Sequence, residues 1–133
     1  MLEVEVISPT KMVKRAEVKM VVVPASEGNV GVMRNHIPFS SSIKPGLLKF
    51  YDADDYLSKT FFVAKGFVNV IAEKCAILAE RIDEDWQSAN ADSILKQIET
   101  LERDLEASKE RDQIDQIKEE LLILKTHVQL LNL

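Results

Sequence analysis

The chain of 133 residues has room for one compact domain and a smaller appendage, and its 46% hydrophobic and 29% charged residues are typical of a globular protein. A net charge of −5 without a basic cluster argues against binding to nucleic-acid phosphates. No apolar run approaches the ~20 residues of a membrane span. Glu3 and Glu5 interrupt any signal-like stretch, and the single Cys75 has no disulfide partner. We therefore expect a water-soluble protein without direct membrane insertion.

The first part of the chain predicts short β-strands. Residues 2–6 alternate apolar and charged side chains, as a strand with one buried face does. Residues 18–23 are rich in β-branched valine, and Pro24 is expected to end that strand. Many such stretches separated by polar turns predict an antiparallel β-sandwich of about ten short strands. Further strand-like stretches are residues 47–51, 56–64, 67–71 and 75–79.

From about Asp83 the pattern changes to that of helices. Apolar residues recur at intervals of three and four, which places them along one face of a helix. Continuing the first of these seams beyond Leu105 leads only to polar positions, whereas a second seam starts at Ile114. This slip in register predicts two helices rather than one continuous coiled coil. The first seam comprises Ile94, Ile98, Leu101 and Leu105, and the second comprises Ile114, Ile117, Leu121, Leu124, Val128 and Leu131.

The predicted break between the helices lies near residues 108–112, where Asp112 is expected to cap the second helix. The break contains neither Gly nor Pro, so these residues are also able to continue one long helix. Burial of roughly 1.5–3 kcal/mol per large apolar side chain is opposed by about 1–2 kcal/mol of backbone ordering per residue. Packing partners would then decide between a hairpin and an extended helix. We predict two domains, a sandwich over residues 1–83 and a C-terminal α-helical hairpin over residues 84–133.

Several segments of the first part carry a recognisable pattern, beginning with residues 21–32, VVVPASEGNVGV. This stretch resembles the loop-and-strand signature of the ATP synthase epsilon subunits. The segment Asn35-His36-Ile37-Pro38 is close to the family's Gly-His-Ala-Pro. These matches, in order and at the expected spacing, cover most of residues 2–83, and the order of a sandwich followed by two helices covers the remainder. The other matching segments are residues 43–46, residues 62–70 and Ala79-Glu80.

The resemblance implies a non-catalytic rotor subunit in the central stalk of a proton-translocating F-type ATP synthase. Its implied partners are the gamma subunit, the membrane c-ring and, when the helices extend, the catalytic alpha/beta head. In that extended state the helices would restrain ATP hydrolysis. The isolated chain is expected to be a monomer without a cofactor. Its expected place is the cytoplasmic face of the bacterial inner membrane, as a peripheral part of the complex.

Three residues match family positions that contact the ring or gamma: Glu27, Asn29 and His36. At the Asn29 position many relatives have an acidic residue that pairs with a basic ring loop. Because Asn cannot supply that charge, we expect the contact to be weaker or shifted to Glu27. For His36, rotor docking and a hydrogen-bonded turn histidine are both open.

Ile82 and Asp83 match the start of a motif that binds ATP in some relatives. Trp86 and Gln87 stand where those relatives have Arg and Ala, which removes the guanidinium suited to phosphate. ATP is therefore not expected as a regulatory ligand, and Asp83 is expected to cap the first helix.

In relatives with inhibitory helices, basic residues are thought to meet an acidic segment of the catalytic subunit. The candidates here are Arg103, Arg111, Lys118 and Lys125. Residues 86–133, however, carry 6 Lys and Arg against 10 Asp and Glu. Such interleaving of charges is typical of a solvated face, which is the alternative interpretation.

No catalytic or metal site is predicted. The two histidines are far apart, and neither a nucleophile elbow nor a phosphate-binding loop is present, which argues against a β-sandwich hydrolase. The acidic residues of the segment 52–55 lack a ligand-spaced partner. His127 lies beside the second seam and is expected to be structural. The alternative function is a structural adaptor that dimerises through its C-terminal heptads.

Overall fold

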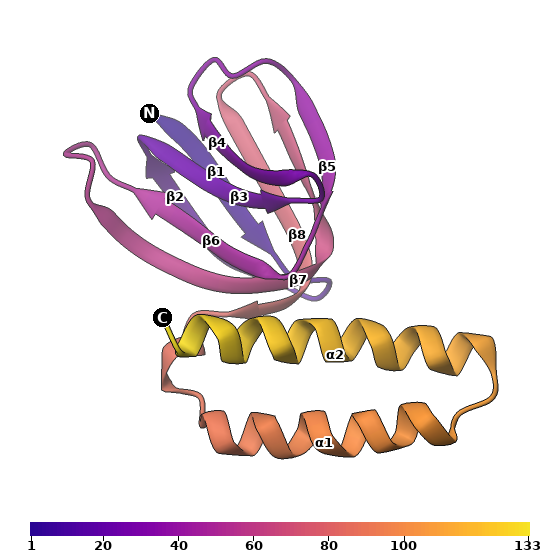
Figure 1. Cartoon of the computed structure of the whole chain (residues 1–133). Coiled ribbons are helices and arrows are strands. Elements are labelled where there is room, and N and C mark those ends of the chain that lie inside the picture. The colour runs from indigo at the N-terminus through magenta and orange to yellow at the C-terminus, as the bar shows by residue number, and fades with distance from the viewer. The chain divides into compact units, whose positions relative to one another are not determined.

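The computed structural model describes all 133 residues, which divide into two compact units, Met1–Glu84 and Asp85–Leu133. The first unit is a β-sandwich and the second is helical (Figure 1). The strands are β1 Leu2–Ile7, β2 Met12–Val18, β3 Met20–Ala25, β4 Gly28–Met33, β5 Phe39–Ile43, β6 Gly46–Tyr51, β7 Leu57–Ile71 and β8 Lys74–Asp83. The helical elements are a 3-10 turn η1 Trp86–Ser88, α1 Ala91–Ala107 and α2 Arg111–Leu131.

The strands form a sheet in the order β2-β1-β8-β7-β5-β3-β4, in which β6 also pairs with β3 and β7. All pairs are antiparallel except β1 with β8. The long strand β7 holds the two layers together, because its first half pairs with β6 and its second half with β5. Figure 1 shows β7 curving along the sandwich.

The structure has eight strands, and one of them, β7, covers the two stretches expected at residues 56–64 and 67–71. Its pairing changes from β6 to β5 at Lys65-Gly66, where Lys65 has a φ of 60°. A Cβ atom at Gly66 would lie 1.9 Å from the carbonyl oxygen of Leu78. Only glycine therefore fits where the strand passes from one layer to the other.

Pro24 does not end its strand, contrary to expectation. The ladder between β3 and β4 continues on both sides of it, through the pairs Val23–Val30 and Ala25–Gly28. Its carbonyl oxygen accepts a hydrogen bond from the N–H of Lys44 at 2.8 Å. Proline is tolerated in a strand where its missing N–H is not required by the ladder.

The sandwich core follows from alternation along the strands. In β1, for example, Leu2, Val4 and Val6 are fully buried, while the intervening side chains lie on the other face. The rings of Phe50 and Phe61 pack with their centroids 5.5 Å apart and fill the centre of the core. The other buried members are Val18, Val21, Val23, Val32, Ile43, Leu48, Val63, Val68, Val70, Cys75, Ile77 and Ala79.

The capping residue of α1 is Asn90 rather than Asp83. The side chain of Asn90 accepts a hydrogen bond from the N–H of Ser93 at 3.1 Å. Asp83 instead ends β8 and pairs with Phe62, because the ladder between β7 and β8 extends to this residue. The prediction that Asp83 caps a helix was therefore wrong.

The break between the helices spans residues 108–110, because α1 ends at Ala107 and α2 begins at Arg111. Glu110 is the N-cap of α2 and makes no capping bond through its side chain. Asp112 was expected at this cap but lies in the first helical turn. There its negative charge interacts favourably with the positive end of the helix dipole.

The two apolar seams pack against each other within the chain. Neither α1 nor α2 combines the length and apolarity needed to cross a lipid bilayer. The buried seam residues are Ile94, Ile98, Ile117, Leu121, Leu124 and Val128, with Ala89, Leu101, Leu105 and Leu131 partly buried against them.

Candidate interaction surfaces

The turn between β3 and β4 exposes Glu27 at one end of the sandwich. Ser26 fixes this turn, because its N–H and its hydroxyl both donate to the carbonyl of Ser42, at 3.0 and 2.9 Å. Asn29 follows in β4 and is also exposed. Glu27 and Asn29 line a depression of ≈ 450 Å³ whose walls are residues 25–30 and 39–42. Its carboxylate, amide and serine hydroxyls suit a donor or cationic group of a partner.

His36 lies beyond the other end of β4. Its N–H donates to the carbonyl of Met33 at 3.1 Å, and its Nδ1–H donates to the carbonyl of Ile37 at 2.7 Å. The ring also meets Phe39 edge-on, at 6.2 Å between centroids. His36 is thus hydrogen-bonded within its turn, and its role in rotor docking stays a prediction. Phe39 also lines the depression that Glu27 lines, so the ring contact places His36 next to a wall residue of that depression.

A row of apolar side chains, three exposed and one half-buried, crosses four neighbouring strands, and no spacing in the sequence predicts it. Phe67 in β7 is opposite Leu78 in β8, and their exposed fractions are 65% and 46%. Ile7 is paired with Leu78 on one side and with Met12 on the other. Directly paired residues share a face, so the four side chains form one apolar row. Contiguous exposed apolar side chains make this row a candidate protein contact.

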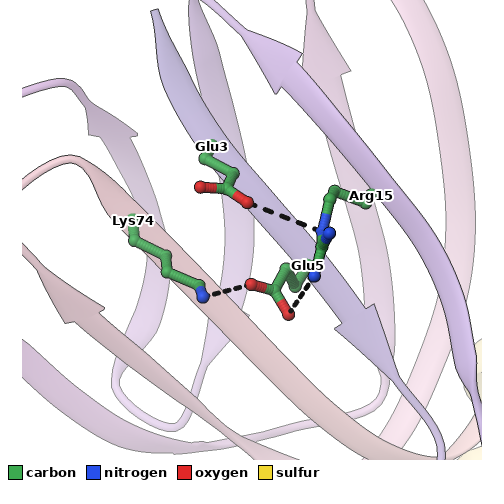
Figure 2. Close-up of polar contacts among 4 residues, drawn as sticks. All are labelled: Glu3, Glu5, Arg15 and Lys74. Atoms are coloured by element: carbon green, nitrogen blue, oxygen red, sulfur yellow. Dashed lines mark ion pairs between the residues drawn. The ribbon is translucent and has the colours of Figure 1, made fainter.

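Charged residues form a cluster beside this row, across β2, β1 and β8 (Figure 2). The carboxylate of Glu5 contacts Lys74 Nζ and lies 3.7 Å from Arg15 Nη2, and Arg15 Nε lies 3.5 Å from Glu3. The contact with Lys74 lowers the pKa of Glu5, although burial opposes this, and it raises the pKa of Lys74. The two acids and two bases balance. The cluster therefore joins three strands instead of presenting a net charge to a ligand.

The acidic side chains Asp52 and Asp55 in the turn between β6 and β7 are bonded to groups of the protein itself. The Oδ1 atom of Asp52 accepts hydrogen bonds from the N–H groups of Asp54 and Tyr56, both at 3.0 Å. Asp55 forms an ion pair with Lys19 at 2.7 Å. No group of three or more His, Cys, Asp or Glu side chains is placed to hold a metal ion.

The residues of the nucleotide motif are divided between the two units. Ile82 and Asp83 are the last residues of β8 in the sandwich. Trp86 and Gln87 belong to η1 in the helical unit, where Trp86 is buried. None of the four stands at the head of α1, which begins at Ala91.

Three of the four basic candidates lie along one exposed stripe of α2. They recur every seven residues, which is close to two helical turns and therefore returns to the same face. Arg111 lies 3.9 Å from Asp115, an exposed pair that contributes little to stability. Arg103 is on α1 and does not belong to this stripe. The stripe comprises Arg111, Asp115, Lys118, Leu122, Lys125 and Gln129, all of them exposed.

A sandwich with an exposed apolar row, followed by a two-helix unit, has the features of a small protein-binding module. Residues 1–85 match the family described as the β-sandwich domain of the ATP synthase delta/epsilon chain. This chain therefore belongs to the ATP synthase delta/epsilon chain family.

Two relatives extend this similarity beyond residue 85, and a third matches over a shorter stretch. The epsilon chain of Rhodospirillum centenum is 36% identical over 108 residues, which cover 79% of this chain and 74% of that one. The epsilon chain of Rhizobium rhizogenes is 29% identical over 124 residues, or 93% and 90% of the two chains. The match to the Rhodospirillum rubrum epsilon chain is 36% identical over 78 residues and covers 59% of this chain and 58% of that one.

Two solved structures share the fold. A chain in the mitochondrial ATP synthase of Euglena gracilis, determined with OSCP, F1 and the c-ring, has a TM-score of 0.82 at 17% identity, covering 98% of this chain and 81% of that one. A chain in the central stalk and c-ring of the Tetrahymena thermophila mitochondrial enzyme has a TM-score of 0.51 at 18% identity, covering 70% and 69%. At these identities the similarity concerns the fold alone.

Proposed function

We propose that this chain is the epsilon subunit of a rotary F-type ATP synthase. In this role it is a non-catalytic part of the central stalk and couples rotation of the membrane ring to the catalytic head through gamma. The observation that carries the proposal is the family match over residues 1–85. The relative that is similar over 93% of this chain, through both helices, is also an ATP synthase epsilon chain.

The apolar row is the proposed contact with gamma. It crosses four strands of one rigid sheet, so its side chains are held in place before binding and little conformational entropy is lost. Phe67 is its largest and most exposed member. Burial of apolar area contributes roughly 25 cal/mol per Å², and aromatic side chains at an interface centre commonly dominate the binding energy.

Glu27 and Asn29 are the proposed contact with the membrane ring. They share one depression at the end of the sandwich, where Glu27 supplies the negative charge that Asn29 lacks. His36 contacts Phe39, which lines the same depression, and is proposed as a further contact with the ring or with gamma. The chain would then be peripheral to the membrane and held there by its partners, at the cytoplasmic face if the source is bacterial.

The stripe on α2 is the proposed inhibitory surface. Its three basic residues are spaced by about 10.5 Å, at ~1.5 Å per residue, which suits an acidic helical segment of the catalytic head. The exposed Leu122, 55% accessible, lies between Lys118 and Lys125 and adds apolar contact area. The proposed inhibition requires α2 to leave α1 and reach the head. ATP has no proposed regulatory role because the motif residues are not assembled around α1.

The seams also bear on the adaptor hypothesis. The heptad residues that would pair between two chains are buried against each other in one chain. We therefore expect the isolated protein to be a monomer. Native mass spectrometry at micromolar concentration tests this, and a stable dimer would support the adaptor hypothesis instead.

The function is tested by measuring ATP hydrolysis of an epsilon-depleted catalytic head during titration with this chain. We expect the intact chain to inhibit and a chain ending at Asp85, which retains the whole sandwich core, to bind gamma without inhibiting. A chain with Arg111, Lys118 and Lys125 replaced by Gln should bind equally well and inhibit less. Failure of every version to bind gamma would contradict the proposal.

A further inference from the structure

A buried hydrogen bond joins the end of α2 to the segment that leads into α1. His127 is 1% exposed, and its Nε2 lies 2.8 Å from the carbonyl oxygen of Trp86. A carbonyl oxygen only accepts, so Nε2 carries the proton and donates it. Trp86 opens η1, the short turn before α1, so the bond connects two ends of the helical unit.

This bond exists only while the two helices form a hairpin. His127 follows Ala91, the first residue of α1, by 36 positions, which would separate them by about 54 Å in one continuous helix. The backbone hydrogen bonds inside α1 and α2 persist in either state. The apolar seam is lost on opening, but a partner with apolar side chains can replace it. A hydrogen bond of defined geometry to the Trp86 carbonyl is not replaced in this way.

A contact made in one state only shifts the balance between states by its own free energy. We propose that the His127–Trp86 hydrogen bond is a latch that holds the helical hairpin closed and that its loss favours the extended state. The biological consequence rests on the proposed function, because opening would present the α2 stripe to the catalytic head. The latch itself is a property of the isolated chain.

The latch is tested by distance measurement in the full-length protein. Spin labels on Asp92→Cys and Gln129→Cys, both at exposed positions, report the separation of the helix ends by double electron–electron resonance. The two labelled positions would be about 55 Å apart in a continuous helix and much closer in the hairpin. Cys75 is buried, and its burial raises the pKa of its thiol to about 12, so it remains unlabelled.

Three substitutions separate the latch from general destabilisation. His127→Phe keeps a ring but removes the donor, and it should raise the extended population on the order of tenfold, as expected for loss of one buried hydrogen bond. His127→Gln retains a donor and should stay closer to the parent. Leu124→Asp buries a charge in the seam and should open the hairpin, so it serves as the positive control for detecting the extended state.

The proposal is overturned if His127→Phe stays as closed as the parent while Leu124→Asp opens. It is equally overturned if both His127 variants lose helical circular dichroism, because His127 would then maintain the helices themselves. An extended population in His127→Phe that reverts in His127→Gln supports the latch. If that result is obtained and the chain nevertheless fails to inhibit the catalytic head, the latch stands and the inhibitory function fails.

Discussion

The sandwich and the helical unit differ in how many buried residues stabilise each of them internally. The sandwich buries a core cluster of 17 residues that come from all eight strands, which are joined by ladders between distant parts of the chain. The helical unit buries six seam residues between two helices whose backbone bonds are local. Local helices survive the loss of their tertiary partner better than strands do. The sandwich is therefore suited to a fixed docking role and the helices to a change of state.

The largest effect is expected at Gly66, where β7 passes from one layer of the sandwich to the other. Gly66→Ala places a Cβ against the backbone of Leu78, which cannot move away without breaking the sheet. We expect a loss of about 3 kcal/mol or more in the free energy of unfolding of the sandwich, measured by urea titration. Gly31→Ala is the control, because its Cβ would meet only the flexible side chain of Met20, at 3.3 Å. Equal effects of the two substitutions would contradict this explanation of the corner.

The helical seam should respond independently of the sandwich. Leu124→Ala removes a buried seam side chain, 3% exposed, and should cost about 2–4 kcal/mol of hairpin stability. Hydrogen exchange of the amides around the seam should accelerate, while the strand amides keep their protection. Leu122→Ala is a matched control on the exposed face of the same helix and should change little. Faster exchange throughout the strands would show that the two units unfold together.

The apolar row should affect binding but not folding. If the row contacts gamma as proposed, Phe67→Ser should weaken that binding about tenfold, because the proposed interface loses an exposed aromatic side chain. Isothermal titration calorimetry measures this affinity. Tyr56→Ser is the matched control, since Tyr56 is 71% exposed but lies outside the row. If the Tyr56 and Phe67 variants bound gamma equally well, the apolar row would not be the contact surface.

The smallest expected effect concerns pH. The pKa of Glu5 is lowered by its contact with Lys74, and the pKa of Glu84 is lowered by its contact with Lys59. A carboxyl group with a lowered pKa in the folded state contributes stability above its ordinary pKa of about 4.5, and this stability is lost as the pH falls through the folded value. Urea titrations between pH 3 and 7 should show a shallower decrease for Glu5→Gln than for the parent. The same slope in both would exclude Glu5 as a contributor.

The local patterns in the sequence predicted the elements better than their ends. Alternation at residues 2–6 and the seam spacing around Leu105 and Ile114 were sufficient for a sandwich and two helices. The continuation of β3 through Pro24 depends on the distant Lys44 N–H, and the single strand β7 depends on the corner at Gly66. Such long-range pairings leave no local signal in the sequence.

The candidate surfaces also differ in whether a local sequence pattern indicates them. The stripe on α2 is visible in the sequence as a seven-residue spacing of Arg111, Lys118 and Lys125. The apolar row is not, because Phe67, Leu78 and Met12 become neighbours only through the registers of four strands. Glu27 and Asn29 were identified by family resemblance, and their roles stay a prediction.

Membership of the rotor is tested most directly by ATP-driven proton pumping of an F-type ATP synthase that has been depleted of its epsilon subunit and reconstituted in vesicles. We expect this chain to restore pumping and Phe67→Ser to restore it only at roughly tenfold higher concentration, in line with weaker binding to gamma. No recovery with the folded parent chain, at concentrations well above those at which the vesicles' own epsilon subunit restores pumping, would contradict the assignment to the rotor.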